Sequence, residues 1–253
     1  MIYDIQKASM GKRISAFLFD GILLSVVIVA VAFLLSSALG YDGYSANLEA
    51  AYDKYQTEYG ITFDITQEQY LALSEEELAA YDTAYEALIA DTEAMYNYNM
   101  VINLTLIIVS VGILLGFLAM EFLVPMLFGN GQTLGKKIFG IALVRSDGVK
   151  INGMQLFART VLGKFTIETM IPVYILILIF FNAMGIVGPI IVGVLGVAQV
   201  AALLVTRNNC ALHDLIGGTV VVDMASQMIF KSSDDLIAYQ KKVAAEKAAR
   251  QKY

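Results

Sequence analysis

The run TMIPVYILILIFFNAMGIVGPIIVGVLGVAQVAALLVT, residues 169–206, decides the fold, because none of its 38 residues is charged. At about 1.5 Å per residue it would form a helical rod of roughly 57 Å, whereas one membrane span needs about 20 residues. The run therefore predicts two spans, at 165–183 and 186–205, with one span plus a re-entrant segment as the alternative. The turn between the two spans is expected at Asn182, Gly185, Gly188 and Pro189.

Two further spans are predicted at 14–39 and 100–128, which contain charge-free runs of 19 and 21 residues. The whole chain of 253 residues is 58% hydrophobic with a mean hydropathy of +0.66, which is too apolar for a soluble domain of this size. The first run exceeds the apolar core of a cleaved signal peptide, about 7–15 residues, so we expect it to be retained. The sequence thus predicts an all-α membrane protein with four transmembrane helices.

Lysine and arginine are distributed unevenly between the segments that join these spans. Sixteen of the 17 lie in 1–13, 129–164 and 206–253, and only Lys54 lies in the loop 40–99. Basic residues near span ends favour the cytoplasmic side. We therefore expect a multi-pass protein of the cell (plasma) membrane with both termini in the cytoplasm. The loop, which carries 13 of the 23 acidic residues and a formal charge of −12, would be extracellular.

The acidic loop has the pattern of a helical cap rather than of a disordered linker. Ser74 and Glu77 fit a capping box, Thr66 and Gln69 fit a weaker one, and Gly60 marks a break. No Gly or Pro follows Ser74 before the second span, so a single helix is predicted from there into it. Ten of the 14 tyrosines lie in this loop. Packing of the cap, or interfacial anchoring, explains them best, and a surface for a partner or cation is the alternative.

The segments expected in the cytoplasm show short strand-like or helical patterns. Residues 138–144 predict a short interfacial strand or helix that ends at the turn Asp147–Gly148 within 129–164. The β-branched run 219–222, within 206–230, is its expected partner strand. The tail 231–253 is predicted to be a basic helix, solvated or on the membrane surface, and nucleic-acid binding is not expected.

One carboxylate occurs near the same end of each of three spans: Asp20, Glu121 and Glu168. Ionisable groups within hydrocarbon are costly, so each is a candidate for function. Carboxylates that exchange a proton for a cation are the minimum chemistry of an antiporter, and these three form our candidate ion or proton site. A structural ion-pair network that sets helix register is the alternative.

Such carboxylates need charged partners. The basic candidates are Arg13, Lys136, Arg159, Lys164 and the only histidine, His213, and the acid Asp214 beside this histidine is included with them. Arg13 shares a helix face with Asp20 but lies about 10 Å away along the axis, so contact within that helix is not expected. The two lysines and Arg159 are expected to pair across helices instead. For His213 a hydrogen-bonded structural role is favoured over a proton shuttle.

Motifs of common enzymes are missing from the sequence. It contains no Gly-x-Ser-x-Gly elbow, no Walker loop and no His-Glu-x-x-His motif, and it has one cysteine, Cys210, and one histidine. We therefore expect no enzyme activity, no catalytic residues, no cofactor and no bound metal centre. The single cysteine also excludes an intrachain disulfide.

Four patches resemble the RDD family of bacterial membrane proteins, named for an arginine and aspartates in the first span. They are RISAFLFD at 13–20, Glu121 with GQTLGKK at 131–137, VRSDG at 144–148 and HDLIGGTVVV at 213–222. The matching positions that we carry over without a role are Arg13, Asp20, Glu121, Lys136, His213 and Asp214. Gly21 departs from the family, where many members have a second aspartate, and the outer loop is longer than usual.

The resemblance implies a transport-related role, because some members are linked to sodium/proton exchange. We therefore expect a cation/proton antiporter that uses intramembrane carboxylates, with monovalent cations and protons as partners in the lipid bilayer. Four spans are few to enclose a pathway, so a homo-oligomer is expected. The alternative is a non-transporting scaffold, sensor or accessory subunit that binds a protein partner through the acidic extracellular loop.

Overall fold

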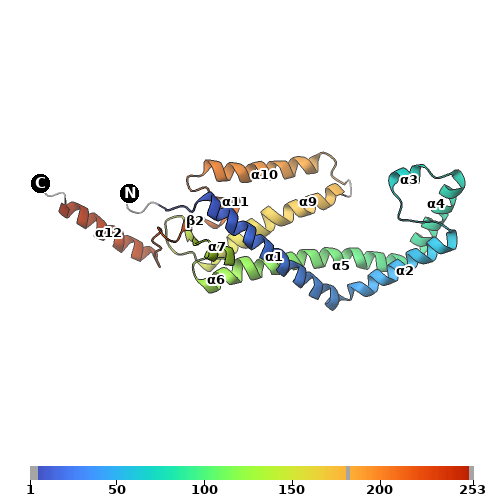
Figure 1. Ribbon diagram of the computed structural model, residues 1–253, viewed down its shortest axis with the longest axis horizontal. Coiled ribbons are helices and arrows are strands. Elements are labelled where there is room, and N and C mark those ends of the chain that lie inside the picture. Colours follow the sequence, from blue (N-terminus) through green and yellow to red (C-terminus); the bar gives the residue numbers. More distant parts are fainter. Residues whose placement is uncertain (1–4, 181–182, 251–253) are drawn as a thin grey trace. The chain divides into compact units, whose positions relative to one another are not determined.

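The structure is a computed structural model that describes residues 5–180 and 183–250 (Figure 1). The chain divides into two compact units, the first formed by Met1–Ile28 with Ile113–Tyr253 and the second by Val29–Gly112. Three predicted segments, 1–13, 165–183 and 231–253, each include residues outside the described part.

Four helices in the described part of the chain are long and apolar enough to cross a membrane: Met10–Leu39, Thr92–Phe128, Gly153–Phe180 and Val187–Val205. This confirms the predicted all-α membrane fold with four spans. The last helix has 19 residues, enough to span, so the charge-free run 169–206 does not require a re-entrant segment.

Two of these spans contain π-helical segments. The first and last spans are the single α-helices α1 (Met10–Leu39) and α10 (Val187–Val205). The second span consists of α5 (Thr92–Phe117), the π-helix η1 (Leu118–Leu123) and α6 (Val124–Phe128). The third consists of α8 (Gly153–Phe157), the π-helix η2 (Ala158–Met170) and α9 (Ile171–Phe180). The third helix thus begins at Gly153, well before position 165, at which the sequence predicts the start of the third span.

The turn between α9 and α10 is shorter than expected. Gly185 lies in it with a φ of +50°, a conformation that favours glycine. Gly188 and Pro189 lie instead in the first turn of α10. Proline is tolerated there because the amide groups of a first turn have no acceptor within the helix, so the missing N–H of proline costs no hydrogen bond. Asn182 lies outside the described residues. Figure 1 shows α9 and α10 next to each other, and they are in contact.

A two-stranded antiparallel sheet lies beside the spans of the first unit. It consists of β1 (Ile141–Arg145) and β2 (Thr219–Asp223), with Leu143 opposite Val221, as the β-branched patterns predict. The short helix α7 (Leu134–Ile138) precedes β1, so this region contains both a helix and a strand. The helices α11 (Leu212–Gly217) and α12 (Ser233–Arg250) flank β2 in the chain.

The second unit contains the helical cap. Its helices are α2 (Tyr41–Tyr59), α3 (Gln67–Leu71) and α4 (Glu75–Ala90), followed by the start of α5. Both predicted capping boxes are present, and Gly60 ends α2 in a left-handed conformation. Tyr55, Leu88 and Ala94 form a small core with partly buried aromatic rings around it, as expected for packing tyrosines.

The prediction of one helix from Ser74 into the second span is wrong. The helix is interrupted at Asp91, whose ψ is 108°. Asp91 Oδ1 accepts hydrogen bonds from the amides of Glu93 and Ala94, as a residue that starts a helix does. A new helix, α5, therefore begins at Thr92.

Candidate functional site

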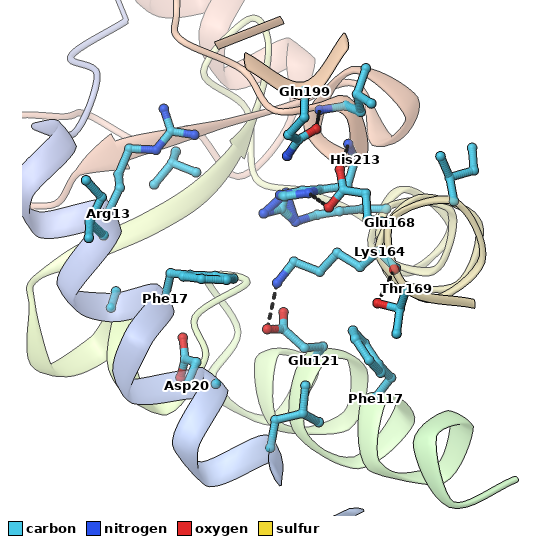
Figure 2. Close-up of a pocket in the computed structure, with 18 of the residues that line it drawn as sticks. Arg13, Phe17, Asp20, Phe117, Glu121, Lys164, Glu168, Thr169, Gln199 and His213 are labelled. Atoms are coloured by element: carbon cyan, nitrogen blue, oxygen red, sulfur yellow. Dashed lines mark hydrogen bonds and ion pairs between the residues drawn. The ribbon is translucent and has the colours of Figure 1, made fainter. Parts of the chain in front are cut away.

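The first unit contains a cavity of about 780 Å³ between its spans. Apolar side chains of α1, α5, α9 and α10 form most of its wall, including Leu24, Ile28, Ile113, Phe117, Pro172 and Leu195. Charged and polar side chains also face it, and Figure 2 labels Arg13, Asp20, Glu121, Lys164, Glu168, Gln199 and His213. The cavity therefore combines apolar walls with a group of ionisable residues.

Glu121 lies at the centre of the charged group, on η1. Lys164 Nζ, from η2, lies 2.6 Å from its Oε1, and Lys136 Nζ, from α7, lies 3.8 Å from its Oε2. All three side chains are at least 85% buried from solvent. The predicted pairing of these lysines across helices is therefore present, and one carboxylate faces two ammonium groups. Figure 2 shows the pair formed by Lys164.

Asp20 is held by the start of α7 rather than by a basic residue. Its carboxylate accepts hydrogen bonds from the Thr133 hydroxyl and, at 2.7 Å, from the Gly135 amide. Gly135 permits this contact, because a Cβ there would lie 2.6 Å from the Ala16 carbonyl oxygen. Asp20 therefore fixes α1 to α7 through neutral donors, which suit a carboxylate at a helix N-terminus.

Asp214 on α11 joins the two arginines of the predicted set. It is fully buried and accepts hydrogen bonds from Arg13 on α1 and from Arg159 on η2. Thr219 also donates to it, and Asp214 accepts the Ala211 amide at the start of its own helix. The Asp214 carboxylate therefore links α1, η2 and α11. Removing any of its donors would leave a buried negative charge with fewer hydrogen bonds in apolar surroundings, which is unfavourable.

Glu168 contacts the only histidine. His213 Nδ1 lies 2.7 Å from Glu168 Oε2, and the His213 amide donates to Oε1 at 3.0 Å. Gly163 on η2 lies directly against His213, where a Cβ would come within 2.7 Å of the histidine Cβ. The histidine therefore occupies a closely packed, hydrogen-bonded position, as the structural interpretation predicts, and also borders the cavity.

Burial changes the proton affinity of two basic groups outside the spans. Desolvation lowers the pKa of Lys136 to about 8, although the Glu121 charge opposes this. Desolvation, reinforced by the nearby Arg159 and Lys164 charges, lowers the pKa of His213 well below its ordinary value. His213 is therefore neutral at pH 7, whereas Lys136 exchanges its proton close to physiological pH.

The three carboxylates of the candidate site line one cavity but do not form one cluster. Asp20, Glu121 and Glu168 each have separate partners. Among residues 5–180 and 183–250, no group of three or more Asp, Glu, His or Cys side chains is placed to hold a metal ion.

Several residues that position the site carry no signal of function in the sequence. Thr133 and Gly135 hold Asp20, and Gln199 on α10 accepts the Leu212 amide that begins α11. Thr133 also begins α7 by accepting the Lys136 amide. A Thr before a helical run is an N-cap signal, so its local role was detectable. Its contact with Asp20, 113 positions away, was not.

The RDD family model matches residues 7–218 of the chain. The matched region ends just before β2 and does not include α12. It includes Arg13, Asp20, Glu121, Arg159, Lys164, Glu168, His213 and Asp214. No curated protein and no solved structure matches the chain.

Proposed function

The chain belongs to the RDD family of membrane proteins and crosses the membrane several times, and on this premise we propose that it exchanges a monovalent cation for a proton at Glu121. The observation that carries the proposal is the buried contact of one carboxylate with two lysines beside a cavity. Buried lysines lose their protons more readily than exposed ones.

The proposed exchange keeps the charge of the site constant. An entering cation takes the place of one lysine ammonium beside Glu121. The N–H bond of that ammonium breaks, its electron pair stays on nitrogen, and the proton leaves. Lys136 is the better proton carrier, because its 3.8 Å contact with Glu121 is looser than that of Lys164 at 2.6 Å. When the cation leaves, a proton returns to the amine.

Glu168 is proposed to accept the released proton, because its carboxylate borders the same cavity, and His213 is proposed to hold that carboxylate through their 2.7 Å contact. Asp20 is assigned to hold α1 in place. We further propose that copies of the chain associate to enclose the full pathway, since four spans leave much of the cavity wall to a neighbour or to lipid.

Ion flux in proteoliposomes tests the proposal. Wild-type protein should dissipate an imposed pH gradient when a suitable monovalent cation is added, with sodium, potassium and organic cations tested in turn, and Glu121→Gln should abolish this flux. Asp147→Asn is the matched control, because Asp147 pairs with Arg145 on the surface and does not line the cavity. The absence of cation-dependent proton flux in folded wild-type protein would refute exchange.

A second candidate function is that of a scaffold or accessory subunit, favoured by the separate core of the acidic second unit. Deletion of residues 45–96 should then release a partner while the protein still inserts into the membrane. Charge removal at the exposed Glu75 and Glu76 should weaken the same interaction without disturbing the core. Unchanged copurification of the partner with both variants would contradict this role.

A further inference from the structure

The surroundings of Glu121 differ from those of a metal-ion site. Sodium and potassium sites surround the ion with several oxygen atoms that replace its water shell. Here the carboxylate of Glu121 instead pairs with two ammonium groups, those of Lys136 and Lys164. No cluster of three or more acidic, histidine or cysteine side chains that could hold a metal occurs in the described ranges 5–180 and 183–250.

The rest of the cavity is suited to an apolar body. Leu24, Ile28 and Ile113 line it on one side, and Val192 and Leu195 of α10 also border it. These side chains offer neither charge nor hydrogen bonds, so a bare or hydrated metal ion gains nothing from them. A volume of about 780 Å³ exceeds by far what one ion requires and is typical of sites for small organic molecules.

We infer that the cation bound at Glu121 is an amphipathic organic cation, one positive group carried on an apolar body. The inference rests on the proposed function, since it names the substrate class of the same exchange. One carboxylate is sufficient to pair with a single organic cation, because such a cation does not need a complete oxygen shell. The apolar body would lie against the walls formed by α1, α5 and α10.

Two aromatic rings support this assignment. Phe17 on α1 and Phe117 on α5 both line the cavity, as does Glu121, and Figure 2 labels all three. Phe165 packs edge-on against Phe117 with ring centroids 6.1 Å apart, which holds that ring in place. Aromatic faces attract organic cations. A cation in this cavity therefore has two aromatic rings as well as the Glu121 carboxylate in the surrounding wall.

The chain offers a matched pair of positions for blocking the cavity. Gly196 on α10 lines the cavity, and a Cβ there would meet no atom within 4 Å. Gly193 lies one turn earlier with equally open surroundings but does not line the cavity. Gly196→Phe should therefore fill the cavity without disturbing the backbone, whereas Gly193→Phe adds the same ring elsewhere.

The test measures binding of tetraphenylphosphonium to the purified full chain in detergent, with tetraphenylborate as an anion of matched shape. We expect tetraphenylphosphonium to bind and tetraphenylborate not to bind. Glu121→Gln and Gly196→Phe should each weaken binding at least tenfold, and Gly193→Phe should leave it unchanged. Binding in weakly buffered solution should release protons from the wild type.

The other possible results refute the organic-cation site, the substrate class or the exchange, as follows. Equal binding of both ions, or unchanged binding in Glu121→Gln and Gly196→Phe, refutes an organic-cation site. Sodium- or potassium-driven proton flux that tetraphenylphosphonium neither inhibits nor replaces refutes this substrate class while exchange itself stands. Charge-selective binding at Glu121 without any cation-driven proton flux supports the site and refutes the exchange.

Discussion

Asp214 shows that the sequence can identify a candidate residue without identifying the residues that contact it. The sequence marks it as a candidate, because it stands beside the only histidine within a patch that resembles the RDD family. Its partners, Arg13 and Arg159, lie 201 and 55 positions away. Sequence spacing excludes contact between Arg13 and Asp20 but gives no information about a contact of this range. The candidate residues were therefore predictable, and their pairing was only partly so.

At Gly135 the absence of a side chain lets α1 approach α7. A Cβ there would lie 2.6 Å from the Ala16 carbonyl oxygen and 2.9 Å from the Asp20 carboxylate. Gly135→Ala should lower the free energy of unfolding by about 1–3 kcal/mol, as overpacking does, measured by thermal unfolding in detergent. Gly153→Ala is the control, because a Cβ at Gly153 meets nothing within 4 Å. Equal stability of the two variants would contradict this close contact.

Lys136 should give the exchange its pH dependence. Burial lowers its pKa from 10.5 to about 8, so the folded protein binds fewer protons than the unfolded chain between these values. The stability contribution of this group therefore rises as pH increases from about 8 to 10.5. Below about pH 8 the ammonium persists and competes with the entering cation.

We accordingly expect cation-dependent flux to increase as pH is raised through about 8, measured over pH 6.5–9 in proteoliposomes. Lys136→Arg should lose this increase, because arginine stays protonated throughout the range. Lys137→Arg is the matched control, because Lys137 follows Lys136 in the chain but does not line the cavity. A pH profile that is identical in wild type and Lys136→Arg would exclude Lys136 as the proton carrier.

The elements follow from the sequence where their causes are local. Length and hydropathy predict four spans, and the capping boxes at Thr66 and Ser74 predict the starts of α3 and α4. The start of the third helix at Gly153 does not follow from hydropathy, because the charged residues Arg159 and Lys164 precede the apolar run. Their neutralisation by Asp214 and Glu121 is a tertiary effect that composition does not contain.

Ser74 provides a prediction for the cap helix α4. Its hydroxyl accepts the Glu77 amide, and the Glu77 carboxylate accepts the Ser74 amide at 2.8 Å. Ser74→Ala should therefore destabilise the start of α4 by about 1 kcal/mol, seen as faster hydrogen exchange in peptides that cover this helix. Thr57→Ala, at an exposed position inside α2, should leave exchange there unchanged or slower. Unaltered exchange in Ser74→Ala would show that the cap does not limit opening of α4.

For the molecule as a whole, the net charge of −6 is the sum of an acidic loop and basic segments elsewhere. Hydropathy predicts which segments enter the membrane, and this agrees with the helices found. The cavity was not predictable, because it depends on which faces of α1, α5 and α10 lie toward one another. The sidedness of the protein rests on the distribution of basic residues alone and stays a prediction.

Cysteine labelling in cells should establish this sidedness. Cys210 is buried and would be replaced by Ser, after which Glu75→Cys in α4 and Lys241→Cys in α12 place single thiols at exposed positions. Because basic segments stay inside, a membrane-impermeant maleimide should label position 75 in intact cells and position 241 only after permeabilisation. Labelling of both after permeabilisation is the control for reactivity. The reverse pattern in intact cells would invert the protein, and labelling of both positions there would require an even number of spans between them instead of three.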